Sequence, residues 1–452
     1  MRVELRHVPC PALEVPVERP ELSAEEYMLR ARMLYEAVDL DWVAVYGDRE
    51  HFANLMWLTG YDPRFEEALL VLGPDDRRVL FVGVEGVDYA EIAGLPAEIR
   101  FYPPWSIIGQ PHTEAPTLAE MLREIGMKPG DRVGIVGWKT VDPRETGAPA
   151  APAFVPALLP RIIERVTGTR VTDVTATMID PDSGLRTRNS AAQIAIFEWG
   201  AARASAAVLR VVRGIRPGMT ELETAGLFGY QGEPLTMHPI VTSGSGKLIG
   251  LRSPGSRIIA QGDAISVAIG YWGGLTCRAG LVTETPDEEF VERFVEPYFR
   301  TLATWWMTIG IGVTGGEVMA AIAAALGDAP FRSFVNPGHL TSYDEWLHSP
   351  VRAESTIPIA SGMVLAADII PAPLPPGRAL NCEDTVAIAG TRLRAELAER
   401  FPEVWERIQA RRRFMTEALG INLRPEVLPL SIAPAYLPPF WLDPELVCVV
   451  AG

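Results

Sequence analysis

The spacing of hydrophobic positions predicts an α/β arrangement in the first part of the chain. Residues 23–37 open with Ser-x-x-Glu and carry apolar side chains at helical spacing, which predicts a first helix. Short apolar runs follow it at 42–47, 66–73, 77–84 and 132–138. A helical segment at 118–126 precedes the last of these runs. Strands that alternate with helices are typical of an α/β sheet.

The pattern changes near residue 183, where we place a domain boundary that separates 1–182 from 183–452. A long helix is predicted over 190–213, because Ser190 and Gln193 form a capping box and apolar residues follow on one face. Beyond it, strand-like runs lie at 238–244, 264–274, 362–371 and 381–390. Helices are predicted at 289–310 and 317–326, with a helical tail at 393–420 and an extended, proline-rich end.

Composition and charge narrow the class of protein. Of 452 residues, 57 are acidic and 41 are Lys or Arg, for a formal net charge of −16. This balance argues against nucleic acid or an anionic membrane as a partner, since both require clustered basic residues. The four cysteines form no C-x-x-C pair, and the apolar run at 304–313 is too short to span a bilayer. We therefore expect a cytoplasmic protein with reduced thiols.

Histidine is scarce, which limits the residues available for acid–base chemistry or metal binding. The chain has six histidines. His7, His51 and His112 belong to no motif, whereas His238, His339 and His348 lie in segments that carry recognisable patterns.

Several segments, taken in order, carry a resemblance to a known family. They are Asn-Leu-Met-Trp-Leu-Thr-Gly at 54–60, Leu-Arg-Thr-Arg-Asn-Ser at 185–190, Arg-Pro-Gly-Met-Thr-Glu at 216–221, Ile-Val-Thr-Ser-Gly at 240–244, Gly-Asp at 262–263, Gly-His at 338–339, His-Ser-Pro at 348–350, Gly-Met-Val-Leu-Ala-Ala-Asp at 362–368 and Cys-Glu-Asp-Thr at 382–385. This ordered set resembles the creatinase, prolidase and aminopeptidase P family. The resemblance implies an α+β protein, with a creatinase-like N-terminal α/β domain followed by a pita-bread catalytic domain.

The family's peptidases hold two divalent metals with two Asp, one His and two Glu, and this chain departs from that set. The first Asp falls on Ala268, and the second falls within Cys-Arg-Ala at 277–279, where no carboxylate is present. The first Glu is shortened to Asp368, whereas Glu383 and His339 match the family pattern. The resemblance therefore predicts no two-metal centre and no cofactor, with a single divalent metal as the alternative.

Creatinase and its close relatives work on this fold without metal, so the resemblance implies a metal-independent hydrolase of a C–N bond in a small polar metabolite such as an amidine, a guanidino acid or an amide. His238 is the first candidate for the acid and base, and His339 would support the attacking water. Glu383 and Asp368 would bind a cationic or hydrogen-bonding group. The remaining substrate-binding candidates are Arg252, Arg278, Arg64 and His348.

Other interpretations stay open. A Xaa-Pro peptidase-like metalloenzyme or lyase with a rebuilt metal site is one alternative, and a non-catalytic dimeric family member is another. Arg278 could instead form an internal salt bridge to Glu383 or Asp368, and His238 could be a structural residue. Cys277, Cys382 and the tryptophans, among them Trp346, could be core residues. We expect the chain to bind a small-molecule substrate and to form a homodimer.

Overall fold

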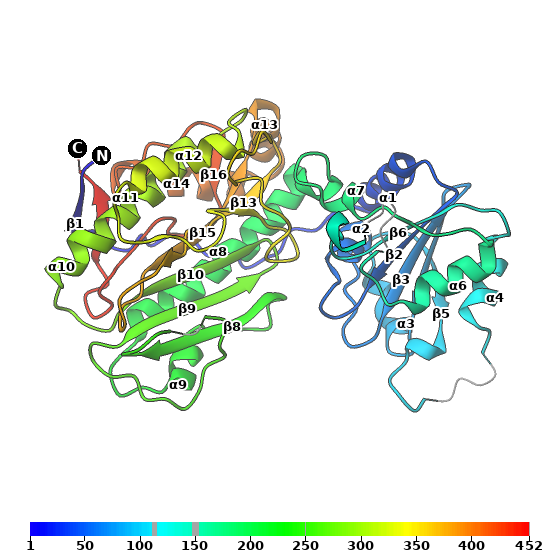
Figure 1. Cartoon of the computed structure of the whole chain (residues 1–452), viewed down its shortest axis with the longest axis horizontal. Coiled ribbons are helices and arrows are strands. Elements are labelled where there is room, and N and C mark those ends of the chain that lie inside the picture. The colour runs from blue at the N-terminus through cyan, green and yellow to red at the C-terminus, as the bar shows by residue number, and fades with distance from the viewer. Residues whose placement is uncertain (111–114, 147–152, 249, 452) are drawn as a thin grey trace. The chain divides into compact units, whose positions relative to one another are not determined.

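The chain forms two compact units. The structure is a computed structural model that describes residues 1–110, 115–146, 153–248 and 250–451, so His112 lies outside the described residues. One unit is Leu22–Thr187, and the other combines Met1–Glu21 with Arg188–Gly452 (Figure 1). The division falls close to residue 183, where the sequence pattern changes.

The first 21 residues lie with the larger unit, whereas we had placed them in the N-terminal domain. Strand β1 (Val3–His7) pairs with β17 (Leu446–Val450) as an antiparallel ladder along its whole length. Backbone groups of a strand need partners, and here the far end of the chain supplies them. The extended leader predicted from the sequence is therefore part of the larger unit.

The smaller unit is a mixed α/β sheet, as expected. Its six strands have the order β5-β4-β3-β2-β6-β7. The strands are β2 (Trp42–Gly47), β3 (Ala68–Gly73), β4 (Arg77–Val82), β5 (Glu98–Phe101), β6 (Val133–Val136) and β7 (Thr172–Asp173). The helices and 3-10 turns are α1 (Ala24–Val38), α2 (Ala53–Thr59), α3 (Gly86–Tyr89), η1 (Ala90–Ile92), η2 (Pro103–Trp105), α4 (Leu118–Glu124), α5 (Pro143–Thr146), α6 (Leu158–Thr167), α7 (Ala176–Ile179) and η3 (Leu185–Thr187).

Local sequence signals set where these helices begin. The Ser23 side chain accepts a hydrogen bond from the backbone N–H of Glu26 at the start of α1. Thr117 and Glu120 form a complete capping box at the start of α4. Such caps satisfy backbone donors that the first helical turn leaves without partners.

The larger unit is built on an antiparallel sheet with the strand order β12-β13-β15-β10-β9-β8, and β16 pairs with β15. The strands of this sheet are β8 (Leu235–Gly244), β9 (Ala264–Tyr271), β10 (Gly274–Leu281), β12 (His339–Leu340), β13 (Val364–Ala367), β15 (Asn381–Ile388) and β16 (Val427–Pro429). A further short pair is β11 (Arg332–Ser333) with β14 (Pro371–Ala372). The helices are α8 (Ala191–Gly214), α9 (Glu221–Gly226), α10 (Glu288–Phe290), the π-helix η4 (Val291–Val295), α11 (Glu296–Thr308), α12 (Gly315–Leu326), α13 (Thr391–Arg400) and α14 (Pro402–Glu417).

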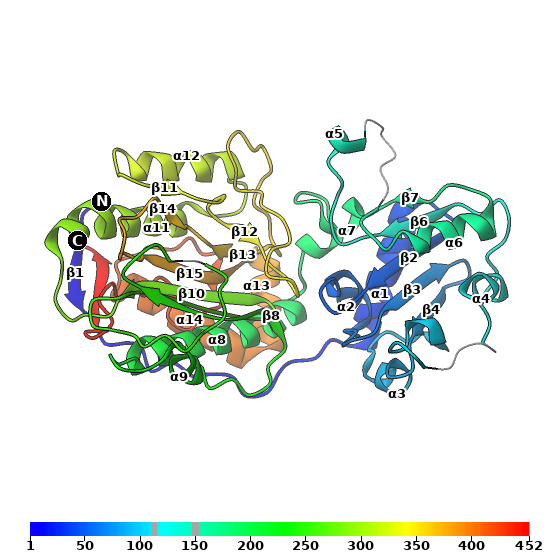
Figure 2. The ribbon, with the colours of Figure 1, turned by 60° about the horizontal axis from the view of Figure 1, so that its bottom comes forward.

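Helix α8 covers one face of this sheet. It packs on β9 and β10 (Figure 2). A buried cluster joins apolar residues of α8, such as Val208, to Val267 and Ile269 on β9. The contact needs glycine at one point, because a Cβ at Gly200 would lie 2.0 Å from the carbonyl oxygen of Trp272. One core cluster of this unit therefore lies between α8 and the sheet.

The tail differs from the single helical segment predicted at 393–420. It forms two helices, α13 and α14, that meet at Phe401, and Pro402 is the first residue of α14. Proline lacks the N–H that a continuous helix requires and fits the first turn of a new one. In the part of the chain that the structure describes, no helix combines the length and apolar character needed to cross a bilayer.

Candidate functional site

A row of side chains crosses the sheet of the larger unit on the face opposite α8. Cys277 pairs with Glu383 on one side and with Ala268 on the other. Ala268 in turn pairs with Ile240 on β8. Directly opposed residues in an antiparallel ladder point to the same face, with Cβ atoms about 5 Å apart. Ile240, Ala268, Cys277 and Glu383 therefore lie side by side.

Asp368 and His339 extend this row from the next two strands. Ala367, the last residue of β13, pairs with Asp384, so Asp368 follows beside Glu383. His339 begins β12, the neighbour of β13. Both side chains are buried, with Asp368 at 5% and His339 at 0% exposure. The sheet thus brings together three residues that the sequence predicted for the site: His339, Asp368 and Glu383.

The imidazole of His339 points between two carboxylates. Its Nε2 lies 3.1 Å from Oε1 of Glu345 and 3.6 Å from Oε1 of Glu383. Its Nδ1 lies 3.2 Å from the carbonyl oxygen of Leu340 and can donate a hydrogen bond to it. The ring of Trp346 stacks on the imidazole at 4.1 Å with an interplanar angle of 20°. When Nδ1 carries its proton, Nε2 needs a second proton or a bound cation to face two negative groups.

Glu345 reaches the site because the chain folds back on itself between Leu340 and His348. The backbone N–H of Leu340 donates to the carbonyl of His348 at 2.6 Å, and Leu347 N–H donates back to Leu340 at 2.9 Å. These bonds fold the chain so that Glu345, six residues after His339 in sequence, lies against the imidazole. Glu345 belongs to none of the motifs in the sequence. The gap between His339 and His348 is longer than the resembling family usually shows, and this was the available signal for an inserted residue at the site. The role predicted for the His348 side chain stays a prediction.

Burial and mutual repulsion perturb the carboxylates. Burial raises the pKa of Asp368 to about 7, although His339 opposes the shift. Burial and the negative charge of Asp368 raise the pKa of Glu383 well above its usual range. Burial disfavours the charged imidazole, but Glu345 and then Glu383 raise the pKa of His339 well above 6.5. The site therefore holds a proton-carrying histidine next to carboxyl groups that ionise with difficulty.

Two carboxylate oxygens in the site are buried without a hydrogen bond. Among the described residues, neither Asp368 Oδ1 nor Glu383 Oε1 has a hydrogen-bond partner. A buried polar atom in this state is costly unless a ligand or water completes it. The arrangement is thus suited to bind a group that carries N–H donors or positive charge.

Solved structures with this architecture identify the fold. A prolidase from Pyrococcus horikoshii OT3 superposes with a TM-score of 0.62 at 17% identity, covering 80% of this chain and 95% of that chain. An Xaa-Pro dipeptidase from Bacillus anthracis gives a TM-score of 0.61 at 16% identity, with 82% and 96% covered. An X-Pro aminopeptidase from Thermotoga maritima MSB8 gives 0.61 at 17% identity, with 80% and 94% covered. The chain has the prolidase fold. No family model matches the sequence, and no curated protein matches it.

The two-metal centre expected for a peptidase of the prolidase fold does not fit the residues present. The resemblance places two of its carboxylates at Ala268 and within 277–279, and no residue there carries a carboxylate. The structure pairs Ala268 on β9 with Cys277 on β10. Burial and Glu383 raise the pKa of the Cys277 thiol to about 12, so the thiol is neutral near pH 7. A single ion fits better, because ligand atoms of His339, Glu345 and Glu383 all lie within 4.8 Å of one another. One His and two carboxylates are a donor set that divalent cations accept.

His238 is placed differently from the prediction. It lies where β8 departs from regular pairing with β9, and its side chain is exposed. Its Nε2 lies 2.8 Å from the carbonyl oxygen of Leu251, to which it can donate. The structure thus brings His238 to the backbone of a loop and does not place it in the carboxylate cluster with His339.

Arg278 does not reach the site, because neighbouring residues of a strand point to opposite faces. Its guanidinium is 1% exposed and makes two hydrogen bonds, of 2.9 and 3.0 Å, to the carboxylate of Asp384. It also donates to backbone carbonyls that include those of Tyr436 and Ala433. The internal salt bridge foreseen as an alternative exists, but its partner is Asp384 and not Glu383 or Asp368.

The other two arginines also have protein partners. Arg252 donates to Oε1 of the buried Glu221 at 2.8 Å, so its charge is already compensated. Arg64 belongs to the smaller unit, where its Nε donates to the Tyr89 hydroxyl at 2.8 Å and lies 3.6 Å from Asp62. Substrate binding by either arginine stays a prediction.

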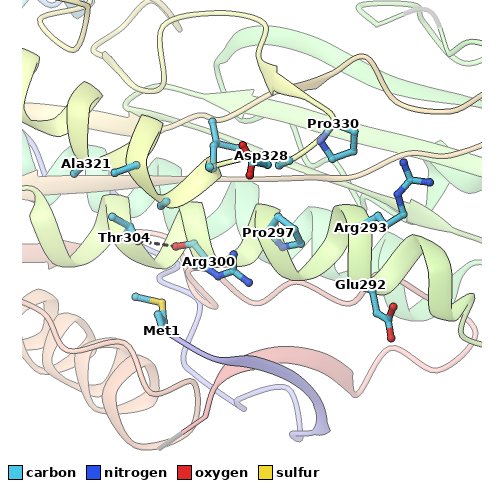
Figure 3. A pocket seen from close by; sticks show the side chains of 14 residues that line it. Met1, Glu292, Arg293, Pro297, Arg300, Thr304, Ala321, Asp328 and Pro330 are labelled. Atoms are coloured by element: carbon cyan, nitrogen blue, oxygen red, sulfur yellow. Dashed lines mark hydrogen bonds between the residues drawn. The ribbon is translucent and has the colours of Figure 1, made fainter.

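A cavity of about 710 Å³ lies elsewhere in the larger unit, beside α11 and the end of α12 (Figure 3). Met1, Arg293, Arg300 and Asp328 contribute to its lining. No residue predicted for the site contributes to it. The cavity therefore does not change the assignment of the site to the row on the sheet.

Proposed function

We propose that this chain is a hydrolase that cleaves a C–N bond in a small polar metabolite with a cationic group, and that it acts without a two-metal centre. The observation that carries this proposal is the pair of buried carboxyl groups, Asp368 and Glu383, each with an oxygen that has no hydrogen bond among the described residues. The absence of carboxylates at Ala268 and in the 277–279 segment supports the claim that the chain acts without a two-metal centre.

The cation would bind at the carboxyl groups. An amidinium or guanidinium group is planar and carries several N–H donors, which suit carboxylate oxygens. Its positive charge would also lower the pKa of Asp368 and Glu383 again, so that both carboxyl groups ionise when the ligand is bound.

In the proposed reaction, water attacks the carbon of the C–N bond. Glu383 accepts a proton from the water as the C–O bond forms, and His339 donates its Nε2 proton to the leaving nitrogen as the C–N bond breaks. The products are a carbonyl compound and ammonia or an amine. The proton on Glu383 then returns to Nε2 of His339, which lies 3.6 Å away. This assigns to His339 the acid–base role first expected for His238.

A second candidate is a hydrolase with a single divalent metal, as in the Xaa-Pro peptidase alternative. It is favoured by the convergence of His339, Glu345 and Glu383 within 4.8 Å. These residues would hold the ion, which would supply a Lewis acid and lower the pKa of a bound water.

The test is metal analysis combined with activity. Purified protein is assayed for release of ammonia or amine from amidines, guanidino acids and amides, and for cleavage of Xaa-Pro dipeptides, before and after EDTA treatment. We expect turnover of a cationic C–N substrate that survives EDTA. We also expect a loss of about a hundredfold or more in His339→Gln and Glu383→Gln at unchanged Tm. Glu289→Gln, an exposed carboxylate with a side chain 75% exposed, is the control.

Two results would contradict this proposal. Turnover that disappears with EDTA and returns with a divalent metal would support the single-metal candidate. Full activity in Glu383→Gln would exclude the role of the carboxylate cluster.

A further inference from the structure

The row of site residues has an apolar half next to its acidic half. Ile240, Ala268, Leu275 and Cys277 are each buried and form a hydrophobic cluster of their own, against which the half-buried Met237 packs. Through the pairing of Cys277 with Glu383, this cluster is the direct neighbour of the carboxyl groups on the same face of the sheet. Ligand sites typically combine an apolar lining with a few polar groups, and this face of the sheet offers both.

The apolar half is separate from the main core of the unit. Val267 and Ile269, the neighbours of Ala268 along β9, belong to the cluster that packs on α8. Ala268 and its partners face the other way. Ile240, Ala268 and Cys277 therefore take no part in the packing between the sheet and α8.

Cys277 lies between the acidic half and the apolar half of the row, and burial raises the pKa of its thiol so that the neutral form is favoured. The amide of Asn381 donates to its Sγ at 3.4 Å, and the hydroxyl of Tyr298 donates to Oδ1 of Asn381 at 3.1 Å. Asn381 is thereby fixed with its amide nitrogen toward the sulfur. The sulfur of Cys277, the next position along the row from Glu383, is therefore held by a hydrogen bond from within the protein.

We propose that Met237, Ile240, Ala268, Leu275 and Cys277 form a subsite for an apolar substituent that the substrate carries next to its cationic group. This inference rests on the proposed function, because the cation is the group held by Glu383 and Asp368. Two strand spacings, about 10 Å, separate Glu383 from Ala268. That distance matches the length of a short alkyl chain or an aromatic ring, so a substituent of this size on the cation would extend over the apolar half.

Isothermal titration calorimetry with a series of n-alkyl amidinium ions tests the subsite. The series runs from formamidinium through acetamidinium and butyramidinium to hexanamidinium, with the full-length protein. We expect affinity to rise about threefold to fourfold for each added methylene until the subsite is filled. Ala268→Leu fills the subsite, so we expect it to abolish this gain while formamidinium still binds. Ile240→Ala widens the subsite and should move the preferred ligand to a longer chain.

Circular dichroism and Tm report whether each variant is folded, and Glu383→Gln separates the two claims. One outcome overturns the subsite and leaves the proposed function standing: formamidinium binds the wild type, Glu383→Gln abolishes this binding, and chain length has no effect on affinity. The subsite is also overturned if affinity rises with chain length to the same extent in the wild type, in Ala268→Leu and in the second variant, Ile240→Ala. If no member of the series binds the wild type, both the subsite and the cationic substrate are overturned.

Discussion

His339 shows how single residues set the chemistry of this site. The imidazole is buried, its Nδ1 faces a backbone carbonyl, and its Nε2 faces Glu345 and Glu383. Glu345 is the closer carboxylate and opposes the effect of burial, which by itself disfavours the charged ring. The proton that the proposed reaction needs is therefore held in place by a residue from the adjacent turn.

Replacing Glu345 with Gln should lower the pKa of His339, because the nearest negative charge is removed while burial is unchanged. The titration of the imidazole nitrogens by NMR measures this shift. Asp344→Asn, a change of the neighbouring carboxylate in the same turn, is the control and should have a smaller effect. An unchanged His339 titration in Glu345→Gln would contradict the assigned contact.

Asp368 should make stability depend on pH. Its pKa is about 7 in the folded protein, because burial raises it from 3.8. Between these values the unfolded chain has lost the proton and the folded chain retains it, so the unfolded state binds fewer protons and stability falls as pH rises. We expect metal-free wild type to lose stability relative to Asp368→Asn from about pH 4 to pH 7, with a constant difference above pH 7.

Differential scanning calorimetry of both proteins after EDTA treatment, at pH values from 4.5 to 8.5, checks this expectation. Cys448→Ser, far along the chain in β17, controls for the effect of an unrelated buried substitution. A difference in Tm between wild type and Asp368→Asn that stays constant over this range would show that Asp368 titrates normally.

At the scale of elements, strand alternation sorts residues that are adjacent in sequence into different roles. Cys277 faces the site, whereas Arg278 faces the opposite side and is paired with Asp384. Pairing between strands then brings Ala268 and Glu383 to the two sides of Cys277. The site is thus a property of the register of β9, β10 and β15.

Arg278→Lys should destabilise the larger unit. Lysine cannot reproduce the two bonds to Asp384 together with those to the backbone carbonyls, and a broken buried ion pair costs about 3 kcal/mol or more. We expect the Tm of the larger unit to fall by about 6 °C or more. The matched change Arg252→Lys affects an arginine whose side chain is 44% exposed. It should lower the free energy of unfolding by about 1 kcal/mol or less. Equal losses in calorimetry would contradict the structural role of Arg278.

At the scale of the whole molecule, the chain is divided into two units that each have a hydrophobic core. The smaller unit buries its own cluster, which includes Trp42 and Phe81. The larger unit includes both ends of the chain, because β1 pairs with β17. Segments that are farthest apart in sequence therefore stabilise the same unit.

Deleting residues 2–8 should destabilise the larger unit selectively. The deletion removes the five-residue ladder of β1 with β17 and exposes the edge of β17. We expect two calorimetric transitions, of which only that of the larger unit shifts to lower temperature. Arg2→Ala, at an arginine with a side chain 82% exposed, is the control. A shift of the other transition, or of neither, would contradict this division.

The sequence was sufficient to predict much of the architecture. Apolar spacing and caps located α1, α8 and the strands around 264–274 and 381–390, because these signals act within a few residues. The motif order pointed to the same fold that the solved structures show. Pro402 was visible as well, but its effect on the tail was underestimated.

The residues of the site were predicted less completely. His339, Asp368 and Glu383 come together, but Glu345 was not identified, and His238 and Arg278 have other surroundings. The location of Glu345 beside His339 depends on how the 340–348 turn folds. The face of the sheet to which Arg278 points depends on its position in the alternation along β10.

By itself, therefore, the sequence determined helices such as α1 and α8, strands such as β9 and β15, the resemblance to the fold, and the loss of carboxylates at Ala268 and in the 277–279 segment, since these follow from residue identity and local spacing. It did not predict β10 as a strand of its own. Only the tertiary structure decided which side chains meet: His339 with Glu345, Cys277 with Glu383, and Arg278 with Asp384. Strand register and turn geometry bring residues from distant segments within a few ångströms, and local sequence patterns do not encode these distances.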